Sequence, residues 1–150
     1  MKRLRPEQVM PQELRPVVEP LPYWFVIGGQ AVRCLVPYRP SRDVDFGTLD
    51  ADSLDRLLEE LRRSGKTEIL ERRPDTVHLT WNGIKVSLFR LEELAPHVEE
   101  RRLTVGGLLA TKLHAVLDRG LRRDFFDLYV LLEQERLGVA TLLAAIRKVY

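Results

Sequence analysis

The 150-residue sequence is short of several features, and each absence excludes a class of protein. Its single cysteine, Cys34, cannot form an internal disulfide, which is typical of a reducing compartment. No apolar run approaches the roughly 20 residues that a membrane span needs, and the basic start of the chain lacks the apolar stretch of a signal peptide. Neither sign of charge dominates, because the sequence has 24 Lys and Arg residues and 22 Asp and Glu residues. We therefore expect a cytoplasmic protein with no membrane partner and at most a local basic patch for nucleic acid.

Strand patterns come first along the chain and helical patterns follow. Short apolar or alternating segments predict strands at 23–27, 43–46, 67–71, 76–81 and 84–89. Asn82-Gly83 joins the last two, and this dipeptide is the strongest short signal for a β-hairpin. Helical periodicity predicts helices at 30–36, 52–63, 104–119, 124–135 and 139–149, with a short one near 11–18.

These elements predict an α+β fold, a mixed sheet with one hairpin followed by a helical piece. Gly65 and Gly120 are expected to cap the helices that they follow. We expect residues 1–95 to form the α+β core, with 1–20 as an N-terminal extension, and residues 96–150 to form a helical lobe.

The segment with the most chemical information joins a glycine turn to two aspartates. Gly28-Gly29 ends an apolar strand, and thirteen residues (30 to 42) separate it from Asp43-Val44-Asp45-Phe46. Residues i and i+2 of a strand share a face, so Asp43 and Asp45 project together while their apolar neighbours enter the core. Two carboxylates on one face favour a cation between them, and Mg²⁺ takes one or two carboxylates and completes its shell with water and phosphate oxygens. The glycines leave backbone N–H groups open to a phosphate at a helix N-terminus.

The arginines Arg39 and Arg42 flank the aspartates and would offset the charge of a triphosphate. Together these residues predict metal-dependent nucleotidyl transfer, in which the metal neutralises charge on the α-phosphate during in-line attack. A plainer interpretation stays open on the residues alone, because Gly-Gly turns are common and an Asp-x-Asp on a strand edge is usually just solvated.

The order of these motifs resembles the DNA polymerase β-like nucleotidyltransferase superfamily, and the C-terminal half resembles the bacterial AbiEii/AbiGii-type toxin nucleotidyltransferases. The second likeness is carried by Leu109-Ala110-Thr111-Lys112-Leu113-His114-Ala115, by Arg119-Gly120 and by Arg122-Arg123-Asp124-Phe125-Phe126-Asp127-Leu128-Tyr129. It extends from about residue 23 to residue 132. The resemblance implies transfer of an NMP from an NTP to an acceptor, with Mg²⁺ or Mn²⁺. The acceptor would be tRNA or another RNA, a protein or a small molecule, and a cognate antitoxin protein would be the partner.

The resemblance also implies roles for particular residues. Asp43 and Asp45 match the metal ligands and catalytic carboxylates, and Lys112 matches a lysine that contacts phosphate. Asp124 and Asp127 match two acids of a later catalytic motif, in which Arg123 stands where many relatives have Lys. The nucleotide-binding set that we expect is Gly28, Gly29, Arg39, Ser41, Arg42 and Lys112.

One position departs from the superfamily pattern. A third carboxylate often stands on a later strand, where this chain has Ser87, although members of the toxin group carry Ser there. A hydroxyl is a poor general base. The alternative function is therefore a catalytically silent nucleotidyltransferase-like module that binds a nucleotide or a protein.

Physical reasoning leaves two alternatives for each residue group of the C-terminal half. Lys112 lies on or beside an apolar stripe, so its ammonium must reach solvent along its stem or meet an anion. Asp124 and Asp127 either form a capping box or pair with Lys112 or an arginine facing the cleft. The basic residues at the same turn bind phosphates or are simply solvated; they are Arg119, Arg122 and Arg123.

Overall fold

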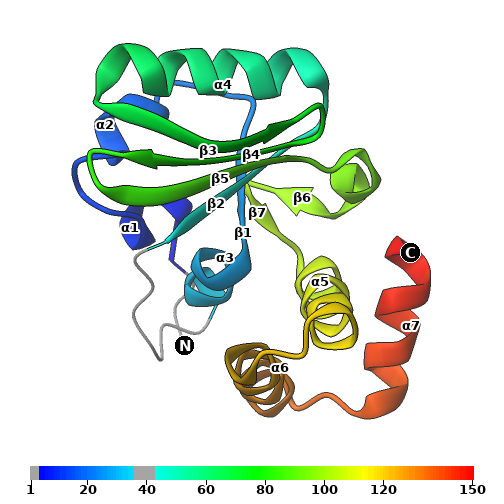
Figure 1. The fold of residues 1–150 in the computed structure, drawn as a ribbon. Coiled ribbons are helices and arrows are strands. Elements are labelled where there is room, and N and C mark those ends of the chain that lie inside the picture. The colour runs from blue at the N-terminus through cyan, green and yellow to red at the C-terminus, as the bar shows by residue number, and fades with distance from the viewer. Residues whose placement is uncertain (1–3, 36–42) are drawn as a thin grey trace.

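A computed structural model describes residues 4–35 and 43–150 and confirms an α+β fold built on a mixed sheet (Figure 1). The strands of this sheet follow the order β1-β2-β5-β4-β3. They are β1 (Phe25–Ile27), β2 (Val44–Thr48), β3 (Thr67–Arg73), β4 (Thr76–Trp81) and β5 (Ile84–Arg90). A separate two-stranded sheet consists of β6 (Val98–Glu99) and β7 (Arg102–Leu103).

The helices fall into three groups along the chain. The N-terminal ones are α1 (Pro6–Val9), α2 (Arg15–Val18) and α3 (Gly28–Leu35). Between strands lie α4 (Ala51–Ser64) and the 3-10 helix η1 (Glu92–His97). The chain ends with α5 (Val105–Asp118), α6 (Arg122–Glu135) and α7 (Val139–Val149), which lie together below the sheet in Figure 1.

Strand direction makes the sheet mixed. β2 and β5 pair in parallel, and the other three neighbouring pairs are antiparallel. Asn82 and Gly83 have φ values of 48° and 81°. Both residues of the turn are thus left-handed, as a two-residue hairpin turn requires, and the predicted hairpin is confirmed.

Helix α4 covers one face of the sheet. Its apolar stripe buries Leu54, Leu57, Leu58 and Leu61. Alternate residues of β4 and β5 are buried on that face: Val77, Leu79, Trp81, Val86 and Leu88. The Trp81 indole N–H donates to the carbonyl oxygen of Leu61 at 3.1 Å, which ties the helix to the end of β4. The residues that alternate with these core positions face the other way, and three of them, His78, Ser87 and Phe89, line a cavity together with Lys112 of α5 and Arg123 of α6.

One expectation about local structure is wrong, because no helix covers Pro11 and α2 begins only at Arg15. Gly65 caps α4 as expected, and its backbone N–H donates to the carbonyl oxygen of Leu61. Its φ of −164° is extended backbone. A Cβ at Gly65 would lie 2.5 Å from the indole nitrogen of Trp81, so close packing is what requires glycine there. Gly120, by contrast, has the predicted left-handed conformation, with φ +59°.

The N-terminal segment contributes to the core rather than hanging free of it. Val9, Leu14 and Val18 are buried, and the Trp24 indole donates to the carbonyl oxygen of Val18 at 2.7 Å. Within the described ranges, no helix combines the length and apolar character that spanning a membrane requires. The division into a core at 1–95 and a lobe at 96–150 stays a prediction.

Candidate active site

On the face of the sheet opposite α4, polar residues of three strands lie side by side. The register pairs Asp45 of β2 with Ser87 of β5, and Ser87 with His78 of β4. A polar cavity of about 210 Å³ opens over this row. It is lined by Gly28, Gly29, Asp43, Asp45, His78, Ser87, Phe89, Lys112, Arg119 and Arg123. The cavity therefore collects residues from the sheet, from α3 and from the helices at the end of the chain.

Glycine is required where α3 begins beside the carboxylates. Gly28 has φ +64°, which residues with a Cβ rarely adopt. A Cβ there would also lie 2.5 Å from the Asp45 Oδ2 atom. The backbone of the first turn of α3 thus lies so close to the Asp45 carboxylate that no side chain fits between them.

The two aspartates have the arrangement that strand alternation predicts. Val44 and Phe46 are fully buried, whereas Asp45 is partly exposed and Asp43 exposed. The buried amide of Gln30, in α3, donates from Nε2 to the backbone carbonyl of Asp43 at 3.3 Å. Burial raises the pKa of Asp45, the neighbouring charge of Asp43 raises it further, and Arg119, Lys112 and Arg123 partly offset the increase.

A divalent cation fits these carboxylates. Burial and the charge of Asp43 raise the pKa of Asp45, so a cation between the two carboxylates would stabilise the charged form of Asp45. Because residue 28 is glycine, no side chain blocks the Asp45 Oδ2 atom. The described residues contain no group of three or more His, Cys, Asp or Glu side chains suited to a metal. Two carboxylates suit Mg²⁺, which usually takes its other ligands from water and substrate phosphates.

Lys112 lies buried at the base of the cavity, on the side formed by α5 and α6. Only 4% of its surface is exposed, and its Nζ atom lies 2.8 Å from Asp127 Oδ2 and 3.4 Å from Asp124 Oδ1. Both carboxylates are fully buried. The alternative in which Lys112 reaches solvent is therefore wrong, and the ammonium meets anions of the protein itself.

Arg119 completes this ion-pair cluster. Its Nε and Nη2 atoms donate to the two carboxylate oxygens of Asp124 at 2.7 and 2.8 Å. Burial disfavours ionisation of Asp124, but the hydrogen bond from Arg119 and the charges of Lys112 and Arg119 outweigh it and lower the pKa of Asp124. The capping-box alternative is wrong, because α6 has Leu121 at its N-cap and no side-chain cap.

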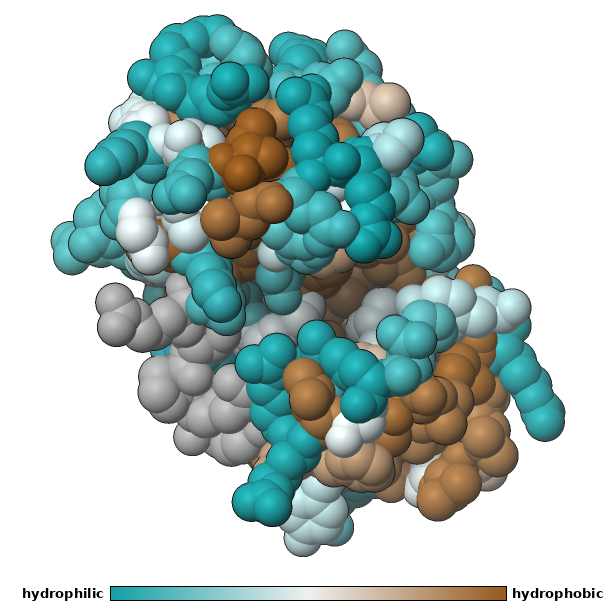
Figure 2. All heavy atoms as spheres, in the orientation of Figure 1, coloured by the Kyte–Doolittle hydropathy of each residue, from teal (hydrophilic) through white to brown (hydrophobic). Residues whose placement is uncertain are grey.

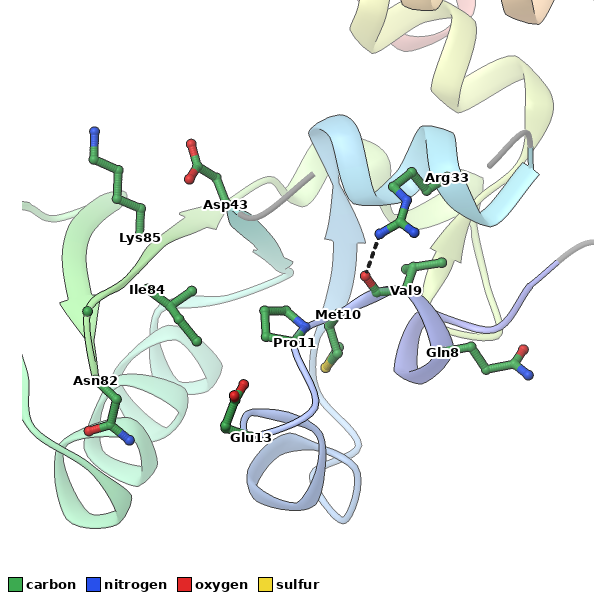
Figure 3. A pocket seen from close by; sticks show the side chains of 11 residues that line it. Gln8, Val9, Met10, Pro11, Glu13, Arg33, Asp43, Asn82, Ile84 and Lys85 are labelled. Atoms are coloured by element: carbon green, nitrogen blue, oxygen red, sulfur yellow. Dashed lines mark hydrogen bonds between the residues drawn. The ribbon is translucent and has the colours of Figure 1, made fainter. Parts of the chain in front are cut away.

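Three predicted nucleotide-binding residues, Arg39, Ser41 and Arg42, lie outside the described residues. A larger cavity of about 790 Å³ lies on the other side of Asp43, between β5 and the N-terminal segment (Figure 3). Arg33 there donates to the carbonyl oxygen of Val9 at 2.9 Å. Since Asp45 does not line that cavity, the smaller one holds the carboxylate pair and is the candidate site.

Sequence reasoning missed His78 and Phe89 as residues of the cavity. The hairpin contained the signal for His78. A two-residue turn at Asn82-Gly83 pairs Trp81 with Ile84, and counting outward from that pair places His78 opposite Ser87.

Several solved structures have a similar fold. The solution structure of the antibiotic-resistance factor ANT(2'')-Ia matches with a TM-score of 0.66 and 10% identity, over 91% of this chain and 86% of that chain. A crystal structure of ANT(2'')-Ia in complex with adenylyl-2''-tobramycin gives 0.63 and 9%, over 91% and 92%. JHP933 from Helicobacter pylori gives 0.61 and 18%, over 87% and 68%. These likenesses confirm the α+β fold with its mixed sheet and helical C-terminal part.

The family follows from the sequence comparison. The family model described as nucleotidyl transferase AbiEii toxin, type IV toxin–antitoxin system, matches residues 15–150, so the chain belongs to this family. The family resemblance inferred from the motifs is thereby confirmed. The uncharacterised protein aq_aa25 of Aquifex aeolicus (strain VF5) is 27% identical over 139 residues, which cover 85% of this chain and 66% of that protein. The matched region thus spans just under two thirds of that relative.

Proposed function

We propose that this chain is a metal-dependent nucleotidyltransferase that moves an NMP from an NTP to a hydroxyl of RNA, as the toxin partner of an antitoxin protein. The observation that carries the proposal is the single cavity in which Asp43 and Asp45 face the first turn of α3 and a basic cluster from α5 and α6. Membership of the AbiEii family supports the reaction class.

Asp43 and Asp45 would hold Mg²⁺ or Mn²⁺, which when bound neutralises charge on the reacting phosphate. Gly28 and Gly29 place the N-terminus of α3 where backbone N–H groups and the helix dipole favour the triphosphate. Arg123 is exposed at the cavity, and no salt bridge within the described ranges engages it. We assign Arg123 to the phosphates, and Lys112 and Arg119, whose charges are paired with Asp124 and Asp127, to a rigid wall behind Arg123.

The outer surface of α6 favours RNA among the acceptors. Phe125, Phe126 and Tyr129 are 54%, 56% and 61% exposed, and with Arg122 they line a hollow of about 680 Å³. Figure 2 shows hydrophobic side chains (brown) at the lower right of the molecule, where Figure 1 places α7, so this hollow on α6 lies beside that area. Exposed aromatic rings beside a guanidinium suit single-stranded nucleic acid, since bases stack on the rings and phosphates meet the charge. Arg122 and Arg123 are consecutive, so this hollow adjoins the active cavity.

The silent module stays the second candidate because of Ser87. No carboxylate lies at that position, and the amine of Lys112 is already engaged by two aspartates. A silent module would bind the nucleotide without transferring it.

The test is label transfer from each of the four α-³²P-labelled NTPs to total bacterial RNA, with Mg²⁺ or Mn²⁺. We expect labelled RNA from the unchanged chain and none from Asp43→Asn or Asp45→Asn. Asp52→Asn, at an exposed aspartate in the first turn of α4, is the matched control and should transfer normally. Metal-dependent nucleotide binding without any transfer would contradict the proposal and favour the silent module.

A further inference from the structure

His78 lines the active cavity, and the proposed function assigns it no role. Its Nδ1 atom lies 2.7 Å from the Ser87 hydroxyl oxygen. Its ring meets the ring of Phe89 edge to face, with centroids 5.8 Å apart and an interplanar angle of 79°. Two contacts therefore hold the imidazole on the face of the sheet opposite α4, one strand beyond Ser87.

A hydroxyl that attacks phosphorus must lose its proton, and the cavity offers few groups to take it. Lys112, Arg119 and Arg123 carry protons as cations, and the first two are fixed in ion pairs with Asp124. Asp43 and Asp45 are committed to the metal in the proposed function. Of the described residues that line the cavity, His78 is left as the side chain with a ring nitrogen placed to accept a proton, because its Nδ1 atom lies at the Ser87 hydroxyl.

The position of Ser87 connects this base to the reacting atoms. Ser87 is the register partner of Asp45 on one side and of His78 on the other. Neighbouring strands lie roughly 4.8 Å apart, so an acceptor hydroxyl on Ser87 would lie beside the phosphate held at Asp45. No described residue forms a hydrogen bond with His78 Nε2, so that nitrogen can keep its proton while Nδ1 accepts one.

We propose that Ser87 and His78 form the proton relay that activates the acceptor hydroxyl, an inference that rests on the proposed function. The acceptor O–H bond breaks and its proton passes to Ser87 Oγ, while the Ser87 proton passes to His78 Nδ1. The acceptor oxygen bonds to the α-phosphorus, the bond from that phosphorus to the bridging oxygen breaks, and pyrophosphate leaves with the electron pair. The imidazolium then returns its extra proton to water.

The competing account is a cross-strand contact that merely stabilises the hairpin. His78→Asn separates the two, because its amide can still reach the Ser87 hydroxyl but takes up no proton. Ser87→Asp in the His78→Asn background supplies a carboxylate base at the same position. Thr80→Ala is the matched control, since Thr80 is on the same face of β4 but does not line the cavity.

The experiment measures the rate of label transfer from an α-³²P-labelled NTP to total bacterial RNA, together with Mn²⁺-dependent NTP binding. We expect His78→Asn and Ser87→Ala to lower kcat about 10²–10⁴-fold, with NTP binding and the KM for NTP unchanged. Ser87→Asp should restore at least about tenfold of the loss in the His78→Asn background, because a positioned carboxylate is a competent base. Thr80→Ala should match the unchanged chain.

Each other outcome overturns a defined part of the account. Transfer that Asp45→Asn abolishes but His78→Asn leaves unchanged would overturn the relay and keep the proposed function. Failure of the unchanged chain to label RNA would overturn both. Label that remains on the protein and disappears in Ser87→Ala would make Ser87 a covalent acceptor, which also contradicts the relay.

Discussion

Replacing Lys112 with methionine is the most informative test of how the helices at the end of the chain form the site. The substitution removes the ammonium but keeps a long, unbranched side chain, so it isolates the charge. Asp127 loses a cation at 2.8 Å and Asp124 loses one at 3.4 Å, and both carboxylates are fully buried. At an effective dielectric constant of about 20, these distances correspond to gross attractions of about 6 and 5 kcal/mol.

The cost of burying the lysine cancels much of that attraction. Asp124 also keeps its two hydrogen bonds from Arg119. Leaving a buried ion without its partner typically costs about 3–5 kcal/mol, and we expect that loss for Lys112→Met. Small domains are stable by only about 5–15 kcal/mol, so the variant should lose a large share of its free energy of unfolding.

Urea unfolding followed by circular dichroism measures this loss. Lys148→Met, at an exposed lysine of α7, is the control and should change stability by no more than about 0.5 kcal/mol. Adding Asp127→Asn to Lys112→Met should recover part of the loss, with a coupling free energy of about 0.5–3 kcal/mol. A loss below about 1 kcal/mol for Lys112→Met, or no recovery in the double variant, would refute the idea that this ion pair holds α5 and α6 together.

Three further predictions concern the cavity and the core. Gly28→Ala should lower the free energy of unfolding in urea by about 1–3 kcal/mol and reduce label transfer, because Gly28 has φ +64° and a Cβ there would meet Asp45. The control is Gly106→Ala in α5, which should be neutral or stabilising because open space surrounds Gly106. Burial and Asp43 raise the pKa of Asp45, so without metal the folded protein should lose stability as pH rises above the unfolded value of 3.8 and through the raised one. In metal-free buffer at pH 7, Asp45→Asn should therefore raise the free energy of unfolding by about 0.5–2 kcal/mol relative to the unchanged chain. The variant should also lose the stabilisation that Mn²⁺ gives the unchanged chain. Equal melting curves for the two proteins would contradict this. Burial raises the pKa of Cys34 to about 12, so Ellman's reagent should react at pH 8 only after urea is added, and fast reaction of the folded protein would show the thiol to be accessible.

Local periodicity accounts for what the sequence predicts correctly. The period of two in a strand is a property of neighbouring residues, so the shared face of Asp43 and Asp45 needs no knowledge of the fold. The Asn82-Gly83 turn is equally local, because both residues tolerate positive φ. Within each feature the residues are no more than two positions apart in the chain.

The features that sequence reasoning misses depend on contacts between distant segments. Whether Lys112 reaches solvent or is buried is decided by how α6 packs on α5. The need for glycine at position 65 comes from the close approach of Trp81 and Asn82. The parallel pairing of β2 with β5 brings Ser87 beside Asp45 across 42 positions of the chain (87 minus 45). His78 enters the site through that pairing and the hairpin together, so its place follows only once both are known.

The most direct measurement of the central claim is the position of Mn²⁺ in crystals grown with a non-hydrolysable NTP analogue, located by its anomalous scattering. The account predicts a peak between the carboxylates of Asp43 and Asp45, with the triphosphate at the N-terminus of α3 and toward Arg123. Asp45→Asn crystals prepared in the same way should lack the peak. A metal bound elsewhere, or an analogue that occupies the larger cavity beyond Asp43, would contradict the account.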